Sequence, residues 1–312
     1  MLKGRSLDSE LIKKRKSEIT ERFGAWTAHN IQLAGDIYTV DKKVFWCASK
    51  LRRITQIVFD NLKRSLPDAR VLDLACLEGL YGIELARHGA EVVAIEGRTA
   101  NIEKANFAKE VLKLDDFEVF HDDVRNLSKE KYGAFDVVLC IGILYHLDVP
   151  DSLHFLENIF EVCQGFAIID THVSLTTEEY YLWRGEKYWG SIYREHSHTS
   201  TEEERADALW ASLDNPTSFW FTRPSLLNLL ERVGFSSVYE CLNPTIARQY
   251  HGYDRITLLA VKGRRTPLHS LPMVNVHEHE KWVERSQCAN LVIKLGRSLP
   301  TEIKAVVKKL IG

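Results

Sequence analysis

The chain has 312 residues, which is long enough for one large domain with additions or for two small domains. Hydrophobic residues make up 45% and charged residues 27%, an ordinary globular mixture, and the net charge of -2 argues against a general attraction to DNA or other nucleic acid. The six cysteines are scattered without a CxxC pair, which predicts reduced core residues of a cytoplasmic protein rather than disulfides or zinc ligands.

No stretch near the first residues is apolar enough to suggest a signal peptide. The longest apolar run, residues 137–145, is too short to span a bilayer, so no membrane span is expected.

Strands and helices alternate along the first two-thirds of the chain. A helix is expected over residues 50–66, ended by Pro67. The next expected strands are 70–75, 91–97, 117–123, 135–141 and 165–173, and the helices between them are 79–89, 99–114 and 151–163. Gly89 is the expected C-terminal cap of the helix 79–89, and Thr99 the expected N-cap of the helix 99–114. Because the strands are apolar runs rather than alternating patterns, we expect a parallel sheet buried on both faces, in a doubly wound α/β domain.

The pattern breaks after residue 173. Residues 174–222 are rich in aromatic and charged side chains and are expected to form an inserted cap. A helix over 223–234 and strands over 236–242 and 255–263 then complete a seven-stranded sheet with a terminal antiparallel hairpin. The predicted organisation is an N-terminal lid with helices (1–66), a core (67–263) that carries the cap, and a C-terminal extension (264–312) ending in an amphipathic helix. That helix is expected to dock on its own domain, with a homodimer contact or a membrane-surface contact as alternatives.

Acidic residues collect where the predicted strands end, at Asp73, Glu96, Asp122 and Asp123. Ligands of open α/β sheets bind at this edge. The loop "DLACLEGLYG" lacks the glycines that a pyrophosphate site needs, and its glutamate would repel a phosphate. The sequence therefore favours a nucleoside with a cationic or zwitterionic arm.

Four motifs support one family. "VLDLACLEG", "VVAIEGR", "HDDVRNL" and "FDVVLCIGILYHL" resemble the motifs of class I S-adenosylmethionine-dependent methyltransferases, which have a Rossmann-like fold. The first motif commonly has glycine where Ala75 and Leu77 stand.

The resemblance implies S-adenosyl-L-methionine as the cofactor. It assigns the methionine arm to the turn from Ala75 to Gly79 and its amino group to Asp73, with the Cys140 and Ile141 carbonyls nearby. Glu96 is assigned to the ribose and Asp123 with Val124 to adenine. The full set of expected cofactor-binding residues is Asp73, Ala75, Glu78, Gly79, Glu96, Gly97, Asp123, Val124, Cys140 and Ile141.

A narrower resemblance concerns the acceptor. "ERFGAWTAHNIQL", "CIGILYHL" and "SFWFTRPSLLNLLERVGF" resemble a subgroup that includes tRNA wobble-uridine carboxymethyl/methoxy transferases and bacterial small-molecule methyltransferases. The basic run at 13–16 is offset by the acidic segment 201–207, and the net charge gives RNA little support. We expect a small-molecule acceptor methylated at oxygen or nitrogen. The alternatives are a tRNA-modifying transferase and a non-enzymatic binding subunit with this fold.

Methyl transfer to a hydroxyl or ammonium group needs alignment and a base. His146 in "LYHL" is the preferred base, and a structural histidine that shapes the pocket is the alternative. Tyr145 and His29 are further catalytic candidates. The expected substrate contacts are Trp26, Asn30, His172, Trp189 and Arg194. No metal site is expected, because the histidine pairs at 196–198 and 277–279 lie in polar, loop-like sequence.

Overall fold

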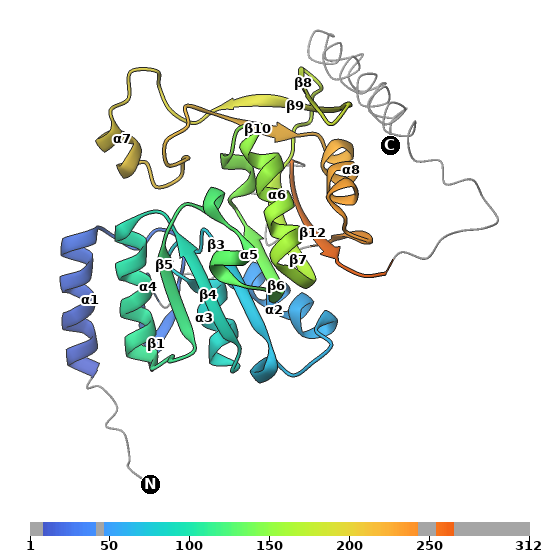
Figure 1. Cartoon of the computed structure of the whole chain (residues 1–312). Helices are drawn as coiled ribbons and strands as arrows, with labels where there is room; N and C mark the ends of the chain where they lie inside the picture. Colours follow the sequence, from blue (N-terminus) through green and yellow to red (C-terminus); the bar gives the residue numbers. More distant parts are fainter. Residues whose placement is uncertain (1–8, 42–46, 243–253, 265–312) are drawn as a thin grey trace, which may run out of the picture.

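The computed structural model describes residues 9–41, 47–242 and 254–264 (Figure 1). The predicted C-terminal helix and the histidine pair at 277–279 lie outside these residues. The central sheet has the order β11-β12-β7-β6-β3-β4-β5. Its strands are β3 (Arg70–Leu74), β4 (Glu91–Glu96), β5 (Phe117–His121), β6 (Phe135–Ile141), β7 (Cys163–His172), β11 (Ser237–Cys241) and β12 (Arg255–Val261). The seven-stranded prediction is confirmed.

The strand directions also agree with the prediction. β3 to β7 pair in parallel, whereas β12 pairs antiparallel with both β7 and β11. The carboxyl ends of five neighbouring strands therefore meet along one edge of the sheet, where the acidic residues were expected to gather.

Helices cover both faces of the sheet. One face is covered by α1 (Ser9–Phe23), α2 (Ala48–Asn61), α3 (Leu80–Arg87) and α4 (Thr99–Leu112), and the other by α5 (Lys129–Tyr132), α6 (Asp151–Val162) and α8 (Arg223–Val233). Successive strand residues point to opposite faces. Val137 and Leu139 belong to the apolar cluster on the face of α1 to α4, and Val138 and Cys140 belong to the cluster on the face of α5, α6 and α8. This alternation explains why the strands read as continuous apolar runs.

Several helix boundaries differ from the prediction. The C-cap of α3 is His88, and the predicted cap Gly89 follows it with φ 96°. The first predicted helix ends at Asn61, and the residues Leu66–Asp68 form a separate 3-10 turn, η1. Thr99 is the first helical residue rather than the cap, because the N-cap is Arg98, whose backbone is extended. Two further 3-10 turns, η2 (Val124–Asn126) and η3 (Leu144–His146), follow β5 and β6.

The insertion forms its own sheet above the edge at which the parallel strands end (Figure 1). Its antiparallel strands are β8 (Glu179–Trp183), β9 (Glu186–Arg194) and β10 (Thr217–Phe221), in the order β10-β9-β8. The buried rings of Tyr188, Phe219 and Phe221 join the apolar cluster under α6 and α8. The acidic segment of the cap is the first turn of α7 (Glu202–Asp207), which has a capping box between Thr201 and Glu204.

A buried ion pair fastens the N-terminal segment to the core. Residues 25–31 precede the short hairpin of β1 (Gln32–Ala34) and β2 (Ile37–Tyr38). Glu78 accepts hydrogen bonds from the backbone N–H groups of Thr27 at 2.6 Å and His29 at 3.2 Å. Lys104 lies 3.5 Å from the Glu78 carboxylate and donates to the Ala25 carbonyl at 2.7 Å. Both charged side chains are fully buried, so each depends on the other.

The loop between β3 and α3 adopts the left-handed backbone conformation without the expected glycines. Ala75 has φ 50° and Leu77 has φ 52°, both in the left-handed region that L-residues disfavour. The Leu77 N–H donates to the Glu96 carboxylate at 2.8 Å, which holds the loop in place. Gly79 follows with φ 84° and is the N-cap of α3.

We predict that breaking the buried ion pair destabilises the fold. Lys104→Met should lower the free energy of unfolding by about 3–5 kcal/mol, because it leaves the Glu78 charge buried without its cation. In the double variant with Glu78→Gln, the combined loss should be clearly smaller than the sum of the two single losses. Urea denaturation of the four proteins measures this coupling, and strictly additive losses would contradict it.

Restoring glycine at position 75 should stabilise the protein. Ala75→Gly should raise the free energy of unfolding by about 0.5–1 kcal/mol. The change relieves roughly 1–2 kcal/mol of backbone strain in the folded state. It also makes the unfolded chain more flexible, which costs about 0.4–1 kcal/mol. The matched control Ala86→Gly, inside α3, should instead cost about 1 kcal/mol. If urea denaturation shows that both variants lose the same free energy of unfolding, the backbone at Ala75 is not strained.

Candidate functional site

A cavity of about 300 Å³ lies at the carboxyl ends of the parallel strands. Four parts of the chain line it: the loops after β3 to β6, the N-terminal segment with the start of α2, the cap segment 209–213, and the start of β12. Among the predicted residues, the lining contains His29, Asp73, Ala75, Glu96, Gly97, Val124, Ile141, Tyr145 and His146. It also contains residues that sequence reasoning did not assign, among them Lys50, Leu77, Tyr81, Arg98, Asp122, Trp210, Leu213 and Arg255.

Glu96 ends β4 as a buried carboxylate. One of its oxygens accepts from the Leu77 N–H at 2.8 Å, and the other from the Arg98 N–H at 2.9 Å and the Asn101 amide at 3.2 Å. Burial raises its pKa, and these hydrogen bonds oppose the rise. A carboxylate held in this way still has acceptor capacity for a ligand diol.

Asp73 lies in β3 with its side chain against α3. Its carboxylate accepts from the Gly82 N–H at 2.9 Å and is 1% exposed. Burial raises its pKa to about 7, the Gly82 hydrogen bond opposes this, and the Glu96 charge adds to it. A β-carbon at position 82 would lie 3.0 Å from this carboxylate, so glycine permits the close approach. Near neutral pH, Asp73 is partly protonated and can both donate and accept.

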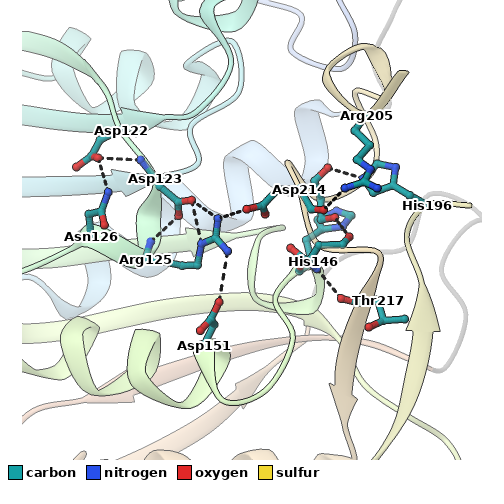
Figure 2. Close-up of polar contacts among 12 residues, drawn as sticks. Asp122, Asp123, Arg125, Asn126, His146, Asp151, His196, Arg205, Asp214 and Thr217 are labelled. Atoms are coloured by element: carbon teal, nitrogen blue, oxygen red, sulfur yellow. Dashed lines mark hydrogen bonds and ion pairs between the residues drawn. The ribbon is translucent and has the colours of Figure 1, made fainter. Parts of the chain in front are cut away.

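The two adjacent acids after β5 have different surroundings (Figure 2). Asp122 lines the cavity, while Asp123 lies outside its lining. Asp123 is engaged by Arg125, at 2.9 Å from Nε and 2.5 Å from Nη2, and Arg125 also reaches Asp151 and Asp214. The predicted adenine contact at Asp123 is therefore replaced by an ion-pair network, and Asp122 is the acid that faces the ligand space.

Asp122 is strongly hydrogen bonded. Lys131 and the Tyr132 hydroxyl each donate to it at 2.5 Å, and Asn126 donates at 2.9 Å. Burial alone would raise its pKa, but these hydrogen bonds hold the pKa well below the ordinary value. Asp122 therefore remains a carboxylate acceptor throughout the neutral range.

Three other predicted cofactor residues also lie outside the lining. Glu78 is turned toward the N-terminal segment and Lys104, so its charge serves the buried pair instead of a ligand. Gly79 is packed against the side chains of Ile83 and Phe117. The Cys140 side chain points into the apolar cluster under α6, as its place in the strand alternation requires.

The three catalytic candidates all line the cavity, but they have different surroundings. His29 is buried, and its Nδ1 accepts from the Leu80 N–H at 3.1 Å, which places the ring proton on Nε2. Burial and the nearby Lys50 lower its pKa to about 3. His29 is therefore neutral, with Nδ1 occupied by the Leu80 N–H and the proton on Nε2, so neither ring nitrogen offers a free electron pair for the predicted role as a base.

His146 ends η3 and pairs with a carboxylate from the cap. Its Nδ1 lies 3.1 and 3.0 Å from the two carboxylate oxygens of Glu195. Burial alone would raise the pKa of Glu195, but the contact with His146 and the hydrogen bonds from Ser218 and Ser212 hold it below the ordinary value. Glu195 follows β9, and no motif in the sequence singled it out.

Tyr145 lies beside a polar cluster at the end of β7. Its ring is edge-on to His172, with centroids 4.7 Å apart, and the Arg255 guanidinium lies 5.4 Å from its centroid. Asp170, which is 1% exposed, accepts from Arg255 at 2.6 Å and from Lys50 at 2.5 Å. Both cations line the cavity and share the Asp170 carboxylate, so this part of the lining offers donors, whereas Glu96 and Asp122 offer acceptors.

The predicted substrate residues do not line the cavity. Trp26 packs against Phe107, with ring centroids 6.3 Å apart, and Asn30 hydrogen bonds the backbone of Val40 and Asp41. His172 lies behind Tyr145, stacked on Trp220 at 4.9 Å with its Nδ1 3.1 Å from Asp254. Trp189 packs on Tyr180 in the cap sheet, and Arg194 is exposed at the end of β9.

Residues of the cap line one end of the cavity, which the sequence did not predict. Arg98 Nη2 donates to the carbonyls of Ala208, Ala211 and Ser212 at 3.1, 3.0 and 3.2 Å. A β-carbon at Gly97 would lie 2.4 Å from the Leu213 side chain, so any larger residue would require that side chain to shift. The segment 208–213, which we call the cap strap, thereby covers the end of the cavity next to Glu96.

No group of three or more His, Cys, Asp or Glu side chains within the described ranges is arranged to hold a metal ion. Within the same ranges, no helix has the length and apolar character needed to cross a membrane. The five cysteines of these ranges, Cys47, Cys76, Cys140, Cys163 and Cys241, are free thiols, and the first four are buried.

Sequence comparison identifies a domain. Residues 71–165 match a family model described as "Methyltransferase domain". The ubiquinone biosynthesis O-methyltransferase of Acinetobacter baylyi is 30% identical over 112 residues, or 36% of this chain and 44% of that protein. The Psychrobacter cryohalolentis enzyme of the same name is 34% identical over 109 residues, or 34% of this chain and 42% of that protein. These matches span less than half of each curated relative.

A solved structure extends the similarity of fold beyond the matched segment. The N-terminal domain of EvdMO1, solved in the presence of SAH and D-fucose, superimposes with a TM-score of 0.63 at 22% identity, covering 84% of this chain and 100% of that one. The matched segment contains β3 to β6, whose carboxyl ends form most of the cavity. Residues 71–165 of the chain thus match a methyltransferase domain, and they lie within a fold that is shared with a domain solved in the presence of SAH.

Proposed function

We propose that this protein is an S-adenosylmethionine-dependent O-methyltransferase that acts on a small molecule. The observation that carries the proposal is the cavity at the ends of β3 to β6, whose lining includes the buried Glu96, the half-buried Asp122 and His146. The matched relatives are named as O-methyltransferases, which favours oxygen over nitrogen as the acceptor atom.

The residues of the cavity fit this cofactor by their chemistry. Glu96 and Asp122 are acceptors that suit ribose hydroxyls and the adenine amino group, and the side chain of Val124 offers an apolar surface. Asp73 suits the amino group of the methionine arm. Because Ala75 and Leu77 in the lining have β-carbons where a pyrophosphate would need bare backbone, the loop suits a nucleoside without phosphates.

Bound S-adenosylmethionine supplies a methyl group on a sulfonium. The protein must align an acceptor hydroxyl with that methyl, exclude water and accept the hydroxyl proton. His146 lines the cavity and takes the proton in this proposal, and Tyr145 beside it orients the acceptor. Alignment in a closed site can supply up to ~7–11 kcal/mol of the barrier reduction.

The enclosure of the cavity supports a small acceptor. The cap strap and the N-terminal segment cover the site from two sides, and Trp210 of the strap belongs to its lining. EvdMO1 was solved with a sugar, and the curated relatives are named for ubiquinone biosynthesis. These are different hydroxyl compounds, so the proposal for this chain stops at a small hydroxylated molecule.

We predict that Glu96 is required for cofactor binding. Titration calorimetry with S-adenosylhomocysteine should show binding to the wild type and about 10- to 150-fold weaker binding to Glu96→Ala, because hydrogen bonds to a charged group contribute about 1.5–3 kcal/mol. The control Glu91→Ala, at the exposed opposite end of β4, should bind like the wild type. Absence of binding by folded wild-type protein would refute the proposed function.

His146 should be required for chemistry and not for cofactor binding. The assay follows label from methyl-labelled S-adenosylmethionine into the small molecules of a cell extract, with the product identified by mass. His146→Gln should lower the rate by about 10²–10⁴-fold while leaving affinity for S-adenosylhomocysteine unchanged. His154→Gln, an exposed histidine of α6, is the matched control. An undiminished rate in His146→Gln would remove the base assignment and leave the cofactor assignment standing.

A further inference from the structure

We propose that Glu195 is a positioning residue that holds the ring proton of His146 on Nδ1 and links this orientation to the docking of the cap strap. The proposal rests on the function proposed above, because it assigns a task to a residue next to the proposed base. Glu195 comes from the inserted cap and lies outside the segment matched by the methyltransferase model.

The first step concerns the proton on His146. A carboxylate has no proton to donate, so the contact at 3.0 Å between Nδ1 and Glu195 requires the hydrogen to be on Nδ1. In the neutral ring, Nε2 then carries the free electron pair that a base needs. Because the partner of one ring nitrogen fixes the chemistry of the other, Glu195 acts through His146 without touching the substrate.

The second step concerns the other donors to the same carboxylate. Glu195 is 1% exposed, and its oxygens accept from the Ser218 hydroxyl at 2.7 Å and from the Ser212 N–H at 2.9 Å. Ser218 belongs to β10, which is part of the cap sheet. Ser212 belongs to the cap strap, so the strap and His146 share one carboxylate.

The third step connects this carboxylate to the cofactor end of the cavity. Arg98 holds the strap through three carbonyls, and its own backbone N–H donates to Glu96. His196 also contacts the Ser212 carbonyl, at 2.9 Å. An unbroken series of hydrogen bonds therefore runs from Glu96 through Arg98, the strap and Glu195 to His146. Undocking the strap breaks this series next to the base.

A purely structural role for Glu195 predicts something different. A carboxylate that only braces the cap would change stability when removed, without a defined effect on the proton of His146. The ring tautomer separates the two roles, because long-range nitrogen–proton NMR spectra of histidine-labelled protein report which nitrogen carries the proton. The His146 signals are assigned by their loss in His146→Gln.

The experiment compares full-length wild type, Glu195→Ala and Ser218→Ala. We expect the Nδ1–H form of His146 in the wild type and in Ser218→Ala, which keeps the His146 contact. In Glu195→Ala, nothing holds the proton on Nδ1, so the Nε2–H form should become the major one. Hydrogen exchange at the Ser212 amide should be ~10-fold faster or more in Glu195→Ala, as expected when a local hydrogen bond is lost.

Two results would overturn the proposal. An Nε2–H ring in the wild type, or the same tautomer in the wild type and Glu195→Ala, removes the positioning role. Unchanged Ser212 exchange in Glu195→Ala removes the link to the strap. Titration of each variant with S-adenosylhomocysteine keeps this test separate from the proposed function: binding with an unchanged tautomer defeats only this inference, whereas a wild type that does not bind defeats the function.

Discussion

The arrangement of the cavity depends on one buried carboxylate, that of Glu96. It accepts hydrogen bonds from the loop after β3, through Leu77, and from the start of α4, through Arg98 and Asn101. Taking a carboxylate out of water is costly unless donors replace its hydration, and here the donors are largely backbone groups that cannot turn away. A site held by such bonds is formed before the ligand arrives, so little binding energy is lost in ordering it.

The cap depends on the same carboxylate by a second route. The Arg98 N–H is fixed by Glu96, and the guanidinium of Arg98 then meets carbonyls of the cap strap at the distances given above. Gly97 lies between these two residues and leaves room for Leu213. The core thus supplies the acids, the insertion supplies the cover, and the three residues from Glu96 to Arg98 join the two. Since insertions vary more freely than cores, we expect acceptor specificity to reside in the cap.

Much of the fold could be predicted because its signals are local. Seven apolar runs predicted the seven strands, and the parallel ladder placed their carboxyl ends together. The same rule placed Glu96 at this edge of the sheet, and Glu96 lines the cavity there. Asp122 and Asp123 were harder to separate, because they are neighbours at a strand end, and only the position of Arg125 decides which one faces the cavity.

Long-range partners account for what sequence reasoning missed. Glu78 looked like a ligand carboxylate, but Lys104 lies 26 positions further along the chain and nothing local announces the pairing. Glu195 meets His146 across 49 positions, through a sheet whose register no motif encodes. Lys50 and Arg255 reach the cavity from a helix and a strand far apart in sequence, joined by Asp170. Each of these contacts follows from tertiary packing, which pattern and propensity do not specify.

The loop without glycines clarifies what the family pattern requires. Ala75 and Leu77 adopt positive φ, so the left-handed backbone is kept although both residues bear a β-carbon. Strain of this kind persists only where surrounding contacts over-determine the conformation, as the bond from Leu77 to Glu96 does. Glycine also lets a ligand approach the bare backbone, and that property is lost, because Ala75 and Leu77 both line the cavity and both carry a β-carbon. The conformation of the loop is thus retained while its surface is changed, which disfavours a pyrophosphate and suits a nucleoside whose arm carries no phosphate.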